Sequence, residues 1–387
     1  MEVCAGGEGA GGDVEVTAAL NRWPRKRLGD ICEFKYGKSL PESARSGGAV
    51  PVYGSNGVVG GHDVPLTVSE TIVIGRKGSH GEVNFSDAPC WPIDTTYFVD
   101  STATVAHLGW LKYRLAGAGL NQMNRAAAVP GLNREDAYRV EILLPPLEEQ
   151  RRIATILDQA ETLRAQRRAA LTQLDSLTQS IFLDMFGDPV TNPMEWVKEP
   201  FGTVCETRLG KMLDSKQQTG ENSRRYLRNA NVQWFQIDTF DLLEMDFDAA
   251  ARKTFKLQSG DLLICEGGEP GRAAIWRGQL EDVYYQKALH RGRPKPDRVN
   301  AEYIVWLLWF LSKCGGLGDH VTAATIAHLT GEKLKAMEIP VPPLPLQQTF
   351  ATHIQAIESL KTTHRAALAQ LDALFASLQE RAFAGLL

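Results

Sequence analysis

Four short segments of this 387-residue sequence concentrate side chains that donate hydrogen bonds. Residues 76–81, 119–125 and 291–295 combine such donors with glycine and are expected on loops, while residues 224–229 form a basic cluster with an aromatic. In the major groove of DNA, Arg reads guanine and Asn or Gln reads adenine, whereas Lys and Ser mostly hold phosphates. Ordinary solvated loops have the same composition, so both interpretations stay open.

A Gly-Lys dipeptide adds a fifth candidate feature because it occurs twice, at Gly37-Lys38 and Gly210-Lys211. We interpret it as a shared turn that is either structural or faces DNA. The candidate DNA-contacting residues come from these features, with Arg208 and Arg272 added. They are Lys38, Arg76, Lys77, Ser79, His80, Asn121, Gln122, Asn124, Arg125, Arg208, Lys211, Arg224, Arg228, Asn229, Arg272, Arg291 and Arg293.

Motifs for catalysis, metals and cofactors are weak. Gly37-Lys38-Ser39 resembles the end of a phosphate-binding P-loop, but that loop needs glycine where Cys32 stands. Asp30 and Glu33 are too close together in sequence to form the metal-binding carboxylate cluster of a nuclease. The six Cys form no C-x-x-C pair and the eight His have no ligand spacing. We therefore expect no catalytic residue, metal site or cofactor in this chain.

An internal repeat dominates the sequence. Residues 145–186 align without a gap to residues 342–383 at an offset of 197, and 18 of the 42 positions are identical. Earlier segments align at offsets of 173 near Trp23 and 190 near Ser69, so the second copy is longer by 24 residues (197 minus 173). The repeat indicates a tandem duplication, in which a variable globular part and a similar helix each occur twice.

The repeat sets the expected domain boundaries. We expect a flexible tail at 1–19, globular domains at 20–144 and 187–341, and long helices at 145–186 and 342–387. The globular parts have the pattern of α/β or α+β domains. Short strands at 71–74 and 261–265 precede Gly-rich turns and return at 82–85 and 273–276, and aromatic-rich helices are expected at 105–115 and 301–311.

Each repeated helix carries a narrow apolar stripe with the seven-residue period of a coiled coil. Because so thin a stripe needs a partner, and the other copy lies in the same chain, we expect the two helices to form an antiparallel coiled coil with pseudo-twofold symmetry. This spacer would depend on Leu147, Gln150, Ile153, Leu163, Leu174, Leu177, Leu344, Gln347, Leu360, Leu371 and Leu374.

The charge distribution excludes a uniformly basic DNA-binding surface. Residues 1–19 have four acidic and no basic residues and so account for the whole net charge of −4. Contacts with nucleic acid must then use local patches or a partner's charge. No apolar run reaches the length of a membrane span, and the first residues lack the pattern of a signal peptide, so we expect a cytoplasmic protein.

The whole pattern resembles the DNA-specificity (S) subunit of type I restriction–modification systems. The resemblance rests on the segment Ile142–Ile153 with its Pro145-Pro146-Leu147 and Gln150, on the helix end Phe186-Gly187-Asp188-Pro189, and on the similar second segment Ile339–Gln347. It covers about residues 20–387.

In that family, each globular part is a target recognition domain that reads one half of a split DNA sequence, and the helices set the gap between the halves. The resemblance implies double-stranded DNA as a ligand. It also implies two copies of a DNA adenine methyltransferase (modification) subunit, docked on the duplicated regions that hold the spacer residues, and restriction subunits as further partners. Methylation and cleavage belong to those partners.

Two other functions fit the same pattern. The specificity subunit of a type IIB-like restriction enzyme would have similar domains but a different partner architecture. A coiled-coil scaffold would use its globular domains to bind proteins rather than DNA.

Overall fold

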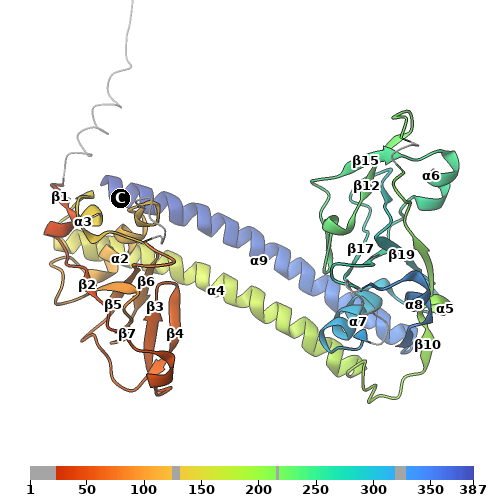
Figure 1. The fold of residues 1–387 in the computed structure, drawn as a ribbon, viewed down its shortest axis with the longest axis horizontal. Helices are drawn as coiled ribbons and strands as arrows, with labels where there is room; N and C mark the ends of the chain where they lie inside the picture. Colours follow the sequence, from red (N-terminus) through yellow and green to blue (C-terminus); the bar gives the residue numbers. More distant parts are fainter. Residues whose placement is uncertain (1–22, 124–130, 215–217, 319–327) are drawn as a thin grey trace, which may run out of the picture. The chain divides into compact units, whose positions relative to one another are not determined.

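The computed structural model describes residues 23–123, 131–214, 218–318 and 328–387 (Figure 1). The chain divides into two compact units. The first comprises Met1–Arg168 and Ala366–Leu387, and the second comprises Ala169–Arg365. The two long helices, α4 (Leu147–Phe186) and α9 (Leu344–Ala384), therefore each contribute one half to each unit.

The first unit contains a four-stranded sheet of order β2-β8-β5-β6, a three-stranded sheet of order β4-β3-β7 and a ribbon of β1 and β9. The helix α2 (Leu108–Ala116) and the short α3 (Arg134–Tyr138) accompany them. The strands are β1 (Arg25–Arg27), β2 (Lys35–Tyr36), β3 (Val50–Gly54), β4 (Gly57–His62), β5 (Thr71–Gly75), β6 (Val83–Ser86), β7 (Trp91–Pro92), β8 (Thr96–Asp100) and β9 (Glu141–Leu143).

The second unit repeats this topology, with sheets of order β11-β19-β16-β17 and β15-β12-β18 and a ribbon of β10 and β20. The hairpin of β13 and β14 and the helix α6 (Ala249–Phe255) are additional, and they lie where the second copy is longer. The remaining elements are β10 (Lys198–Pro200), α5 (Phe201–Val204), β11 (Cys205–Leu209), β12 (Ser223–Leu227), β13 (Val232–Gln233), β14 (Gln236–Ile237), β15 (Leu243–Asp246), β16 (Leu262–Cys265), β17 (Ala273–Ile275), β18 (Tyr284–Tyr285), β19 (Leu289–Pro294), α7 (Ala301–Lys313), α8 (Gly331–Ala336) and β20 (Glu338–Pro340).

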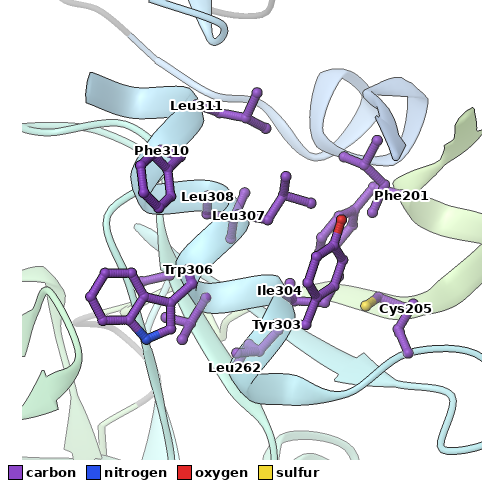
Figure 2. Packing of buried hydrophobic residues seen from close by; sticks show 14 of the residues in the cluster. Phe201, Cys205, Leu262, Tyr303, Ile304, Trp306, Leu307, Leu308, Phe310 and Leu311 are labelled. Carbon is purple, nitrogen blue, oxygen red and sulfur yellow. The ribbon is translucent and has the colours of Figure 1, made fainter. Parts of the chain in front are cut away.

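Apolar runs explain the central elements of each unit. Every residue of β5 and β8 is buried, as expected for strands covered on both faces. In the second unit, α7 is apolar nearly all round, and Figure 2 shows its side chains gathered near Phe201, Cys205 and Leu262. The predicted strands and helices of the globular parts are confirmed, although α2 begins at Leu108, three residues later than predicted.

Antiparallel pairing of α4 and α9 is visible inside each unit. In the first unit, Arg164 on α4 pairs with Asp372 on α9. In the second unit, Phe182 on α4 packs edge-to-face on Phe350 at the other end of α9, with ring centroids 5.5 Å apart. The first half of each helix therefore packs against the last half of the other, and the antiparallel pairing predicted from the pseudo-twofold symmetry of the repeat is confirmed.

Candidate nucleic-acid interface

Four loop segments of the first domain meet beside the sheet β2-β8-β5-β6, and we call this meeting point junction 1. The segments are 37–38 after β2, 53–55 at the end of β3, 76–81 between β5 and β6, and 92–96 before β8. Backbone hydrogen bonds hold them together: Lys38 N donates to Pro92 O (3.0 Å), Ile93 N to Tyr53 O (2.9 Å) and Arg76 N to Thr95 O (2.9 Å).

The second domain contains the same arrangement, which we call junction 2. Its segments are 210–211, 227–229, 266–271 and 285–289. The equivalent backbone hydrogen bonds are Lys211 N to Tyr285 O (3.2 Å), Gln286 N to Leu227 O (3.0 Å) and Glu266 N to Ala288 O (2.9 Å). The duplication has therefore kept a backbone platform while its side chains changed.

The repeated Gly-Lys turn is explained by close packing within these junctions. A Cβ atom on Gly37 would lie 2.1 Å from the carbonyl oxygen of Ile93, and one on Gly210 would lie 2.3 Å from that of Gln286. Only glycine allows so close an approach. The packing of the turn thus requires its glycine, and it places the following lysine at the junction.

In junction 1, two guanidinium groups lie close to one exposed aromatic ring. Tyr36 is 55% exposed. The guanidinium of Arg76 lies 5.4 Å and that of Arg134 5.3 Å from the centre of the Tyr36 ring. The Arg76 Nε and Nη2 also donate to the carbonyl oxygen of Asp94, at 3.2 and 2.5 Å. Sequence reasoning missed Tyr36 and Arg134, although Tyr36 stands directly before the Gly-Lys turn.

The other candidates of the first domain differ in exposure. Lys38, Lys77 and Ser79 are exposed, whereas His80 is half-buried and its Nδ1 lies 3.3 Å from the carbonyl oxygen of Gly78. Asn121 and Gln122 are exposed on a short 3₁₀ turn, Leu120–Gln122, that packs against Gly81. Asn124 and Arg125 lie outside the described residues.

In junction 2, most of the candidate side chains are engaged within the protein. Arg228 pairs with Asp241 (2.5 Å), and Asn229 Nδ2 donates to the carbonyl oxygen of Gly267 (2.8 Å). Arg272 pairs with Glu269 at 3.5 Å and donates to the Asn229 carbonyl at 3.2 Å. These bonds fix the segment 227–229 against the loop between β16 and β17.

Two further candidates of the second domain lie on β11 and directly after it. Arg208 is an exposed residue of that strand. Lys211 donates to the carbonyl oxygen of Asp246, and its ammonium lies 5.0 Å from the centre of the Phe247 ring. The ammonium of Lys211 is thus engaged within its own domain, whereas Arg208 is exposed.

Three arginines that we predict to contact DNA form ion pairs within the second domain, and none of them lies on a loop. Arg291 and Arg293 lie on β19 rather than on a loop, because β19 pairs with β11 on one side and β16 on the other. Arg291 is buried and pairs with Glu206 (2.6 Å), and Arg293 binds both carboxylate oxygens of Asp261 (2.7 and 2.8 Å). Arg224 lies on β12 and pairs with Asp282 (2.9 Å).

Two of the proposed spacer residues, Gln150 and Gln347, anchor each helix to its own domain. The Oε1 of Gln150 accepts a hydrogen bond from His107 N (2.8 Å), and that of Gln347 accepts one from Asn300 N (2.8 Å). Their Nε2 groups donate to Pro145 O and Pro342 O. Both side chains are buried, and so is Ile153, so these three are not surfaces on which a partner can dock.

The predicted coiled-coil stripe is displaced by one residue over much of its length. Leu163, Leu177, Leu360 and Leu374 are each 46–51% exposed, whereas Arg164 and Lys361, one residue later than Leu163 and Leu360, lie in the helix contact. A straight α-helix of 3.6 residues per turn drifts away from a seven-residue repeat, which explains the displacement. Leu147 is 43% exposed, and Leu174, Leu344 and Leu371 are half-buried.

Polar clusters related by the repeat occupy part of the helix contact in each unit. In the first, Arg164 pairs with Asp372 (2.6 Å) and with Glu161, and Arg168 contacts the same two carboxylates. In the second, Lys361 pairs with Asp175 and with Glu358 (both 2.8 Å), and Arg365 lies 3.7 Å from Glu358. Although burial opposes the charge of Lys361, its bonds to both carboxylates raise its pKa above the usual 10.5.

Within the described ranges, no group of three or more His, Cys, Asp or Glu side chains could hold a metal ion. No described helix is both long and apolar enough to span a membrane.

Comparison with known proteins decides the family. The sequence profile of the type I restriction modification DNA specificity domain matches residues 21–173 and again residues 193–373. The chain belongs to this family. It carries two tandem specificity domains, each containing one junction and the first part of one long helix.

Individual members of the family are distant in sequence. The type I restriction enzyme MjaVIII specificity subunit of Methanocaldococcus jannaschii is 21% identical, in a match that spans 67% of this chain and 65% of that protein. A putative type I restriction enzyme specificity subunit of Haemophilus influenzae is 23% identical over 84% of each chain.

Solved structures support the fold. The S subunit of a type I restriction-modification system from M. genitalium matches with a TM-score of 0.62 at 13% identity, covering 94% of this chain and 96% of that one. A chain from a structure on complex assembly and conformational transition of the type I R-M system matches with a TM-score of 0.56 at 17% identity, covering 94% and 98%. These likenesses extend to the tandem arrangement of domain and helix.

Proposed function

We propose that this chain selects the DNA target of a type I restriction–modification complex, with each globular domain reading one half of a split sequence. One observation carries the proposal: junctions 1 and 2 repeat the same backbone hydrogen bonds but present different side chains. A constant backbone platform with different side chains is what two domains that recognise different DNA sequences require. Base edges specify the sequence, while phosphate contacts position the protein.

The partners follow from this role. Double-stranded DNA would contact the junctions, and two copies of an adenine-methylating modification subunit would dock on the repeated helices, whose partly exposed leucines offer equivalent surfaces. Restriction subunits would join them. The chain would supply no catalytic residue and would act in the cytoplasm, where it meets genomic DNA. We keep 20–144 and 187–341 as the reading domains, 145–186 and 342–387 as the spacer helices, and 1–19 as a tail.

Modified-base sequencing tests this function. The chain is expressed with its modification subunit in a host that lacks DNA methylation. We expect a split motif with methyladenine in both halves, which disappears when the chain is omitted. Replacing residues 20–144 by the matching domain of another family member should change one half of the motif only. If both halves change, or if two soluble and associated proteins leave the DNA unmethylated, the proposal is wrong.

A further inference from the structure

Junctions 1 and 2 have opposite charges at two equivalent positions. Arg76, directly after β5, corresponds to Glu266, directly after β16. Asp94, two residues before β8, corresponds to Lys287, two residues before β19. In each junction a backbone hydrogen bond of 2.9 Å joins the two segments. Arg76 N donates to the carbonyl oxygen of Thr95, next to Asp94, and Glu266 N donates to that of Ala288, next to Lys287. The same scaffold therefore presents Arg with Asp in one domain and Glu with Lys in the other.

These side chains have bonding capacity left for a ligand. Glu266 is half-buried, yet its carboxylate accepts no hydrogen bond from any described residue. Lys287 and Asp94 are exposed, and their charged groups make no hydrogen bond within the described ranges. Arg76 uses Nε and Nη2 on the Asp94 carbonyl, and its remaining nitrogen, Nη1, has no acceptor in the described structure. The Glu266 carboxylate is therefore available to accept a hydrogen bond from a ligand.

We propose that each pair reads one G·C base pair in the major groove and that the two pairs read it in opposite orientations. Guanine offers two acceptors, O6 and N7, and its cytosine partner offers the N4 donor. Arg76 would donate to guanine while Asp94 accepts from cytosine. In junction 2, Lys287 would donate to guanine while Glu266 accepts from cytosine. The inference rests on the proposed function, since it requires the junctions to face DNA.

Charge exchange within one junction gives a direct test. The variant R76E/D94K gives junction 1 the charge pattern of junction 2, and E266R/K287D does the reverse. E332K/K335E, which exchanges an exposed ion pair on α8, is the matched control. Each full-length chain is purified with its modification subunit, checked for an unchanged melting temperature, and used to methylate a randomised DNA library that is then sequenced.

We expect R76E/D94K to exchange G and C at one position of the first half-site, and E266R/K287D to do so at one position of the second, with every other position unchanged. The milder variant R76Q should relax discrimination at that same position by roughly 5- to 150-fold, the range for loss of one bidentate base contact. It also keeps the test valid if the double variant does not fold.

Three results would overturn the inference. The motif of the parent chain could lack a G·C pair in one or both half-sites, or the folded variants could still methylate the parent motif unchanged. The variants could also lose sequence preference across a whole half-site instead of at one position. A parent chain that yields no split motif would instead refute the proposed function itself. The two failures are therefore distinguishable in the same experiment.

Discussion

Arg164 on α4 donates to Asp372 on α9 across 2.6 Å, and the repeat generates the equivalent contact between Lys361 and Asp175. Residue 164 plus the offset of 197 is residue 361, and residue 175 plus 197 is residue 372. The two ion pairs are thus copies of one interaction. In the first the cation lies on α4 and the anion on α9, and in the second the cation lies on α9 and the anion on α4. Each fixes the alignment of the paired helices inside its own unit.

The variant Asp372→Asn should destabilise the first unit because Arg164 is largely buried and would lose one of its two anionic partners, keeping only Glu161. Since Asp372 is itself 45% exposed, solvent screens the pair and we expect a loss of about 0.5–1 kcal/mol in the free energy of unfolding. Urea denaturation measures the loss, with Glu380→Gln on the same helix as the exposed control. The charge exchange R164D/D372R should recover part of this loss. If the double variant loses as much free energy of unfolding as its two single variants added together, the role of the pair is contradicted.

Replacing Gln347 by Leu should destabilise the second unit. The buried backbone groups of Asn300 and Pro342 would lose their partner, at an expected cost of about 1–3 kcal/mol. The neighbouring Gln348 is exposed, so Gln348→Leu is a matched control. Below the melting temperature, Q347L should still associate with the modification subunit. Normal stability combined with lost association would instead make Gln347 a docking residue.

The exposed Lys77 should contribute to DNA affinity without contributing to sequence choice. In Lys77→Gln, binding of the complex to all DNA sequences should weaken together, and the slope of log K against log salt should fall by about 1. Titrations at several salt concentrations measure both, with Lys253→Gln on α6 as the control. A changed methylation motif, or an unchanged salt slope, would contradict this assignment.

Acid should destabilise the second domain through His290. Burial lowers the pKa of His290 below its usual 6.5, and the ring contacts the carbonyl oxygen of Leu329 (3.0 Å). Because the unfolded chain binds the proton more tightly, stability is complete above about pH 6.5 and falls as the pH drops below it. Denaturation at pH 7.5 and pH 5.5 should reveal the difference, and His290→Gln should reduce it. Equal pH dependence in the two proteins would argue against this histidine.

The repeat predicted most of the fold because duplicated helices and equivalent strands leave the same residue types at fixed offsets. The one-residue shift from Leu163 to Arg164 was not predictable from the apolar pattern, since it depends on whether the helices supercoil. The glycine within residues 291–295 indicates a loop at Arg291, but strand partners on both sides of β19 override that local signal.

The candidate site was harder to predict than the fold. Tyr36 and Arg134 are 98 residues apart in sequence and become neighbours only through packing of α3 beside β2. Likewise, Asp94 and Lys287 lie in segments of the two copies that have little sequence similarity. Their equivalence is visible only from the backbone hydrogen bonds that both junctions share. Loop partners of this kind depend on tertiary structure.

The inclusion of residues 366–387 in the first unit has a consequence for biosynthesis. Ala382 is completely buried in the core of that unit, and Phe375 and Phe383 pack against it. The ribosome adds these residues only after the whole second domain, so the core of the first domain stays open while the second is being made. Because an open core exposes apolar surface, chains arrested during translation should be preferred substrates for chaperones and proteases.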